Sequence, residues 1–126
     1  MREEVAVFLD KAKKFDSASR DFFDKGVYDL SAFHVEQAFQ LYLKYILAKE
    51  IGYFPKTHSL YKLFKEISKL DSKFWNFYEG NEIILKNVED AYLLARYFPR
   101  EYSRSEVTKM LNVLDEFKRV FGKWIS

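Results

Sequence analysis

The part of the chain that most restricts its fold is the 25-residue stretch from Val27 to Ile51, which is apolar on two sides. As a helix it carries one apolar line of Leu30, Leu41, Tyr45 and Ala48, and a second, opposite line of Val35, Phe39, Tyr42 and Ile46. A helix with one apolar stripe lies on a core, whereas a helix with two stripes needs apolar contacts on both sides. The stretch therefore predicts either a central helix of a small protein or a helix that pairs with a second copy of itself.

Composition predicts one folded domain over residues 1–126, since 48% of the residues are hydrophobic and 19% are aromatic. The chain has no cysteine, which excludes thiolate metal sites, thiol nucleophiles and disulfides. Its N-terminal residues resemble neither a signal peptide nor a membrane span, so we expect a cytoplasmic protein with no membrane partner. With 21 Lys and Arg against 19 Asp and Glu, the net charge of +2 does not by itself indicate the concentrated basic face that binds nucleic acid through its phosphates.

Helical periodicity and helix-ending residues divide the chain into five helices. We expect them at about residues 2–25, 27–51, 57–70, 82–97 and 104–124, with an ambiguous aromatic segment, 72–78, that forms at most a short helical turn. Gly26, Gly52 and Pro99 mark ends, and Ser103 and Glu106 have the spacing of a capping box. No window alternates in polarity as a strand would. The prediction is an all-α, up-and-down bundle whose sequential helices are antiparallel.

The sequence predicts neither a metal site nor a cofactor. The two histidines, His34 and His58, have no second ligand-type residue three or four positions away, and the glycines are too isolated for a phosphate-binding loop. Nothing marks a catalytic nucleophile. His34 shares a line with Leu30 and Leu41, so we interpret it as a half-buried histidine with a satisfied hydrogen bond.

Several polar residues allow two readings. Glu36, Gln40 and Lys44 form a row at four-residue spacing with Gln37 beside it, and such a row is more often a solvated helix edge than a site. Arg96 closes its helix, where a cation interacts favourably with the helix dipole. Taken singly, each of these residues can therefore be explained by its role in a helix, without a binding site.

Together, three short motifs resemble the HEPN domain family in order and spacing over essentially the whole chain. Phe33-His34-Val35-Glu36-Gln37-Ala38 followed by Leu43-Lys44 is similar to the family's second-helix signature. Pro55-Lys56-Thr57-His58-Ser59-Leu60 resembles its entry to the third helix, and Ala95-Arg96-Tyr97 with Pro99 resembles its Arg-Tyr-Pro element. The resemblance implies a four-helix core plus an extra short helix, a homodimer, and a function that involves nucleotides or RNA. It also implies a minimal nucleotidyltransferase as a partner, as in some toxin–antitoxin pairs.

The family's active ribonucleases carry an Arg followed four to six residues later by a His, and that motif is absent here. We therefore predict a non-catalytic module that binds a nucleotide or a nucleotidyltransferase. Its predicted ligand-binding residues are Lys44 and Arg96 for phosphate, His58 for a hydrogen bond or second cation, Tyr97 for stacking on a base, and Gln37. Two alternatives stay open: a metal-independent ribonuclease that uses Arg96 and Tyr102, and a structural dimerisation module.

Overall fold

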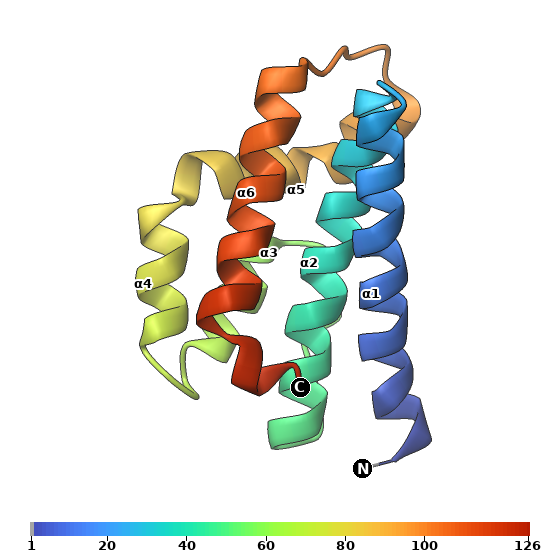
Figure 1. The fold of residues 1–126 in the computed structure, drawn as a ribbon. Helices are drawn as coiled ribbons and strands as arrows, with labels where there is room; N and C mark the ends of the chain where they lie inside the picture. Colours follow the sequence, from blue (N-terminus) through green and yellow to red (C-terminus); the bar gives the residue numbers. More distant parts are fainter. Residues whose placement is uncertain (1) are drawn as a thin grey trace.

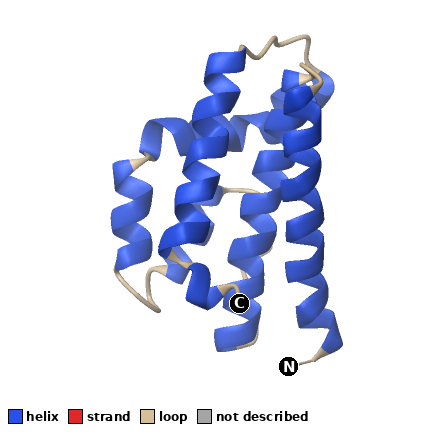
Figure 2. Cartoon of the chain, in the orientation of Figure 1, coloured by secondary structure: helices blue, strands red, loops and turns tan. Residues whose placement is uncertain are grey.

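The computed structural model describes residues 2–126, and these residues form helices joined by short connections, without a strand (Figure 2). The helices are α1 (Glu3–Asp24), α2 (Tyr28–Ile51), α3 (Leu60–Ile67), α4 (Lys73–Gly80), α5 (Glu82–Tyr97) and α6 (Arg104–Val120), followed by the 3-10 turn η1 (Gly122–Trp124). This arrangement confirms the all-α prediction and corrects the number of helices in the described residues from five to six. No helix in residues 2–126 combines the length and apolarity needed to cross a membrane.

The additional helix is α4, which replaces the short turn expected at residues 72–78. Phe74, Phe77 and Tyr78 lie three and four positions apart and are all buried, so two full turns are stabilised by packing. The third helix is correspondingly shorter than expected. It is capped by Ser59, whose side chain accepts a hydrogen bond from the Lys62 amide at 3.2 Å, and not by Thr57.

Helix α2 is the central helix, and both of its sides pack against the rest of the chain (Figure 1). Val35, Phe39, Tyr42 and Ile46 are buried within this one chain. The reading in which this line of residues pairs with a second copy is therefore wrong, because the same chain covers it. Phe39 and Tyr42 contact the Phe117 ring of α6, and Tyr42 also donates a hydrogen bond to Asp16 of α1. The half-buried residues of α2 lie on another side, and the homodimer itself stays a prediction.

The bundle is only partly up-and-down. α1 and α2 form an antiparallel pair joined at Gly26, which has a positive φ of 75° that glycine adopts without strain. α5, in contrast, crosses behind α6 and α2 at a steep angle (Figure 1). This crossing brings the last turn of α5 against α2, where the Arg96 guanidinium lies 5.0 Å from the centroid of the Phe33 ring.

An aromatic cluster centred on Phe117 fills the core between α6, α2, α3 and α4. Its ring contacts the rings of Phe39, Phe64 and Phe77 at centroid distances of 5.6, 6.1 and 5.7 Å. Phe117 and Leu114 are fully buried, which confirms the core face expected for the last helix.

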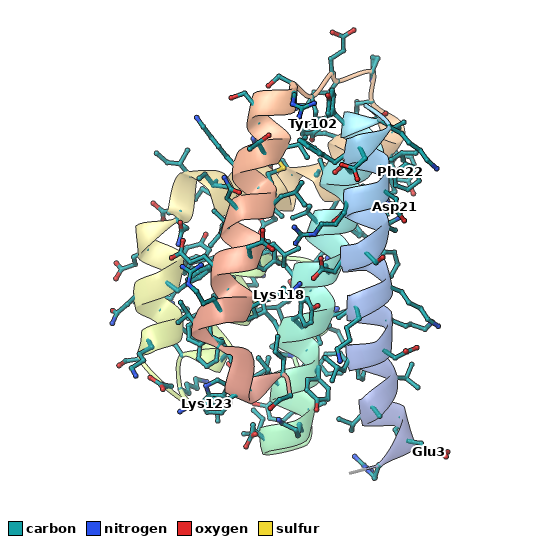
Figure 3. All side chains as sticks on the ribbon, viewed as in Figure 1. Glu3, Asp21, Phe22, Tyr102, Lys118 and Lys123 are labelled. Atoms are coloured by element: carbon teal, nitrogen blue, oxygen red, sulfur yellow. The ribbon has the colours of Figure 1, made fainter. Side chains whose placement is uncertain are left out.

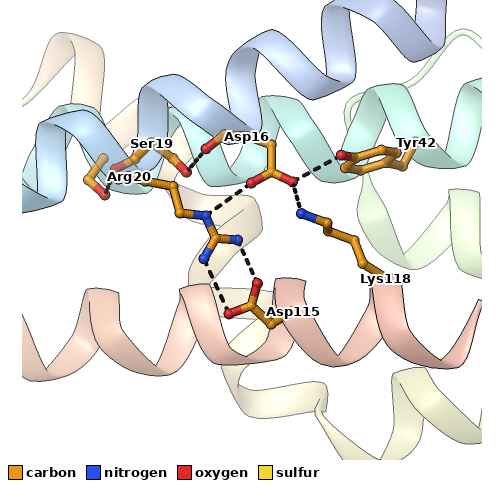
Figure 4. Close-up of polar contacts among 7 residues, drawn as sticks. Asp16, Ser19, Arg20, Tyr42, Asp115 and Lys118 are labelled. Carbon is orange, nitrogen blue, oxygen red and sulfur yellow. Dashed lines mark hydrogen bonds and ion pairs between the residues drawn. The ribbon is translucent and has the colours of Figure 1, made fainter. Parts of the chain in front are cut away.

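A polar network around the buried Asp16 joins α1, α2 and α6 (Figure 4). The carboxylate of Asp16 accepts hydrogen bonds from Tyr42 Oη at 2.9 Å, Lys118 Nζ at 2.7 Å and Arg20 Nε at 3.1 Å. Arg20 also donates both terminal nitrogens to Asp115 at 3.2 and 2.7 Å. The network fixes the three helices relative to one another, because each charged group has a specific partner on another turn or helix.

Candidate functional site

The α2–α3 connection presents His58 to α5. Gly52 ends α2 in the left-handed conformation, with φ of 84° and its amide donating to the Ala48 carbonyl. Glu89 of α5 then accepts hydrogen bonds from the Leu60 and Tyr61 amides at 2.5 and 3.3 Å. These bonds tie the start of α3 to α5 and fix the residue just before the cap, which is His58.

The imidazole of His58 stacks on the Tyr92 ring, with centroids 4.0 Å apart and an angle of 23° between the planes. Nε2 of His58 and the Tyr92 hydroxyl share a hydrogen bond of 2.9 Å. The pKa of His58 is lowered from its ordinary value by partial burial and by the positive charges of Lys44 and Arg96. Arg96 of α5 lies over the same Tyr92 ring, with its guanidinium carbon 4.3 Å from the centroid, and the Lys44 charge of α2 also acts on the imidazole.

Arg96 is held by its own helix and by three aromatic rings. Its Nε donates to the Tyr92 carbonyl at 2.8 Å, and its guanidinium carbon lies 4.3 Å from the Tyr92 centroid, 4.7 Å from that of Tyr97 and 5.0 Å from that of Phe33. Within residues 2–126 it forms no ion pair and its terminal nitrogens donate no hydrogen bond. Such a guanidinium is fixed in position but free to meet an anion.

The polar row of α2 is not the solvated edge that its spacing suggested. Glu36 and Gln40 are buried, while Gln37 and Lys44 are half-buried. Glu36 accepts hydrogen bonds from Gln37 Nε2 at 2.7 Å and from Gln40 Nε2, and Gln40 Oε1 in turn accepts one from Lys44 Nζ at 3.1 Å. Lys44 also lies 5.5 Å from the Phe54 ring centroid. The row is a hydrogen-bonded chain that ends at the Lys44 ammonium.

We call the surface formed by Lys44, His58, Tyr92, Arg96 and Tyr97 the cationic–aromatic face. It includes four of the five predicted ligand-binding residues, and a shallow hollow of about 370 Å³ adjoins it. This hollow is lined by His58, Ser59, Glu89, Asp90 and residues 92–94. Tyr97 is 67% exposed, so one side of its ring is open beside Arg96. The fifth predicted residue, Gln37, donates inward to Glu36.

Tyr92 was not among the predicted residues, although it lies one turn before Arg96 and spacing alone would have placed the two side by side. No sequence pattern indicates the stacking of Tyr92 on His58, because the two residues are 34 positions apart. Among residues 2–126, no group of three His, Cys, Asp or Glu side chains is arranged to hold a metal ion.

Tyr102 does not join this face. It lies where the α5–α6 connection crosses the end of the bundle (Figure 3), and the Arg100 guanidinium covers its ring at 3.7 Å. Its side chain is 6% exposed, its hydroxyl has no hydrogen-bond partner within residues 2–126, and burial raises its pKa. A buried hydroxyl of raised pKa is a poor general base for an RNA substrate, so this geometry argues against the predicted pair of Arg96 and Tyr102.

His34 lies on the side of α2 that faces α1. Its Nδ1 contacts the Leu30 carbonyl oxygen at 2.7 Å, and its ring packs beside Phe15, Phe22 and Phe33. A carbonyl oxygen only accepts, so Nδ1 carries the proton. This is the half-buried, satisfied histidine that the sequence predicted.

Comparison with known proteins gives one assignment. Among functionally curated proteins, no sequence matches this chain significantly. The model of the HEPN domain matches residues 5–124, so this chain belongs to the HEPN domain family.

Proposed function

We propose that this protein binds a nucleotide on the cationic–aromatic face and does not cleave RNA. The observation that carries the proposal is Arg96, a guanidinium held among three aromatic rings without a carboxylate partner in the described chain. A guanidinium matches the geometry of phosphate oxygens and donates to two of them at once. His58 adds a hydrogen-bonding group stacked on the Tyr92 ring that Arg96 also contacts, and Lys44 adds a second cation whose charge acts on His58.

Aromatic groups beside the cations favour a nucleotide over a simple anion. The open side of the Tyr97 ring offers a stacking surface for a base, and such stacking is worth about 1–3 kcal/mol per base. The chain has a net charge of only +2, so this local face rather than the overall charge would supply the attraction. A homodimer and a minimal nucleotidyltransferase partner remain expectations from the family resemblance.

The test is ligand-dependent thermal stability, with AMP, ADP and ADP-ribose as probes. A ligand that binds only the folded protein raises its melting temperature by mass action, and at one hundred times its Kd it adds about 2.7 kcal/mol. Arg96→Ala is expected to abolish the shift. Arg104→Ala is the matched control, because Arg104 is also exposed and also lies over an aromatic ring, 5.0 Å from the Phe23 centroid, but away from the proposed face.

Incubation with RNA in the absence of metal separates the alternatives. Intact RNA together with a ligand shift lost only in Arg96→Ala supports the binding module. Cleavage that stops in both Arg96→Ala and Tyr102→Phe would instead establish the ribonuclease. If neither a shift nor cleavage occurs, the structural dimerisation module is the remaining reading.

A further inference from the structure

A fully buried carboxyl group lies behind the cationic–aromatic face. Glu36 has no solvent exposure, and its two oxygens accept hydrogen bonds from the side-chain amides of Gln37 and Gln40. No lysine, arginine or histidine pairs directly with it in residues 2–126. A buried carboxylate held by neutral amides alone carries a charge that is poorly compensated.

Gln40 connects this carboxyl group to the surface. The Gln40 amide nitrogen donates to Glu36, so the Gln40 oxygen points to Lys44. This oxygen accepts a hydrogen bond from Lys44 Nζ at 3.1 Å. One neutral amide thus separates the buried negative charge from the positive charge that an anion would meet. In this low-dielectric setting the two charges still interact.

The other charged groups around Glu36 come from α5 and the α2–α3 connection. Glu89 of α5 carries a negative charge that raises the pKa of Glu36. Its own carboxylate accepts hydrogen bonds from the Leu60 and Tyr61 amides. His58 and Arg96 both contact the Tyr92 ring on the face. On α1, Lys11 and Lys14 line a hollow with His34 of α2, and Asp16 and Arg20 form a separate network with Lys118 of α6.

We propose that anion binding on the cationic–aromatic face is coupled to proton uptake by Glu36, so that phosphate groups bind more tightly when this carboxyl group is neutral. The proposal rests on the proposed function and adds a regulation of the same site. The ionised carboxylate repels an incoming phosphate and cancels part of the Lys44 charge, and protonation removes both effects. Coupling between two sites is reciprocal, so a bound phosphate raises the proton affinity of Glu36 by the same factor.

The Glu36 carboxyl group changes its charge near neutral pH, where the coupling would alter phosphate binding. Burial raises its pKa to about 7, although the Gln40 and Gln37 amides and the Lys44 charge act in the opposite direction. A modest change in pH around neutrality therefore changes the charge behind the face.

Calorimetry with ADP-ribose tests the coupling, because its two phosphates are diester-like and do not titrate near neutral pH. Titrations in buffers of different ionisation enthalpy measure the protons taken up per ligand bound. We expect roughly tenfold coupling, which corresponds to an uptake of about half a proton between about pH 7 and 8. Glu36→Gln should abolish this uptake and bind roughly tenfold more tightly than the natural protein at about pH 8.5.

His58 is the other group that could take up a proton, so His58→Gln is the control. This variant is expected to bind more weakly but to keep the uptake between about pH 7 and 8. Uptake that is lost in His58→Gln and retained in Glu36→Gln would overturn the proposal.

A measurement without ligand distinguishes failure of this proposal from failure of the proposed function. The carboxyl carbon of Glu36, followed by NMR, should titrate at higher pH in Lys44→Gln, because the positive charge that favours the ionised form is gone. Lys62→Gln, which removes an exposed lysine of α3, should leave the titration unchanged. If none of AMP, ADP and ADP-ribose binds, the proposed function fails, and an unchanged Glu36 titration in Lys44→Gln would overturn the coupling independently.

Discussion

Replacement of Asp16 by Asn tests whether the network between α1, α2 and α6 stabilises the fold (Figure 4). The Asp16 side chain is 6% exposed and accepts hydrogen bonds from Tyr42, Lys118 and Arg20. Asn has nearly the same size but carries no charge, and its amide nitrogen would face groups that also donate. The substitution therefore removes the negative charge and replaces one of the two acceptor oxygens by a donor, without creating a cavity.

The expected loss of unfolding free energy is about 3 kcal/mol. Breaking a buried ion pair by removing one partner costs about 3–5 kcal/mol, because the other charge stays buried and unpaired. Two observations place the loss at the lower end of that range. Arg20 keeps both hydrogen bonds to Asp115, and the Lys118 side chain is 37% exposed, so water can replace part of its lost partner.

Asp115→Asn is the matched control, because it removes a carboxylate that binds the same Arg20 from the opposite side. Asp115 is 49% exposed, and an exposed ion pair contributes about 1 kcal/mol or less. We therefore expect the control to be nearly as stable as the natural protein.

Urea unfolding at neutral pH, analysed by linear extrapolation, measures both variants. The slopes should be equal for all three proteins, so that differences in midpoint report stability alone. A loss below about 1 kcal/mol for Asp16→Asn, or an equal loss for Asp115→Asn, would refute the assignment of a buried stabilising network.

Three further predictions concern the core, pH and assembly. Phe117→Ala should cost about 3–5 kcal/mol in urea unfolding, because it empties the centre of the aromatic cluster, and a loss below about 1 kcal/mol would contradict that placement. Glu36 binds its proton more tightly when folded, with a pKa of about 7 against an ordinary 4.5, so its contribution to stability is present below about pH 4.5 and lost as the pH rises through 7. Glu36→Gln should remove this fall of about 3 kcal/mol, and a stability difference between the two proteins that does not vary with pH would count against it. Light scattering at micromolar concentration is expected to give about twice the chain mass, as the resemblance to the family implies, and the mass of a single chain would contradict the homodimer.

Local sequence determined most helix ends and the path of the chain between them. Ser103 and Glu106 form the capping box that their spacing predicted, with bonds of 3.0 and 3.1 Å between the side chain of each and the backbone of the other. α5 ends at Tyr97 because Pro99 favours an extended conformation at Phe98, as expected. These signals involve residues only a few positions apart, so they can be recognised without knowledge of the fold. The first turn of α3 was less predictable, since Glu89 of α5 binds its first amides in addition to the Ser59 cap. The length of α4 was also less predictable, since the packing of its aromatic residues decided it.

The sequence also identified most of the cationic–aromatic face, through family motifs rather than through geometry. Periodicity alone assigned Glu36 and Gln40 to a solvated edge, and the structure buries both. It also left open whether the second apolar side of α2 meets another copy or the same chain.

Tertiary structure decided these points because each depends on residues far apart in the sequence. The crossing of α5 over α2 joins His58 to Tyr92 and Arg96 to Phe33, and the Lys118 side chain of α6 reaches Asp16 of α1 across 102 positions. A helical repeat specifies which residues share a side of one helix. Which side becomes core, surface or site depends on the free energy of packing all the helices together, and that is a property of the whole fold.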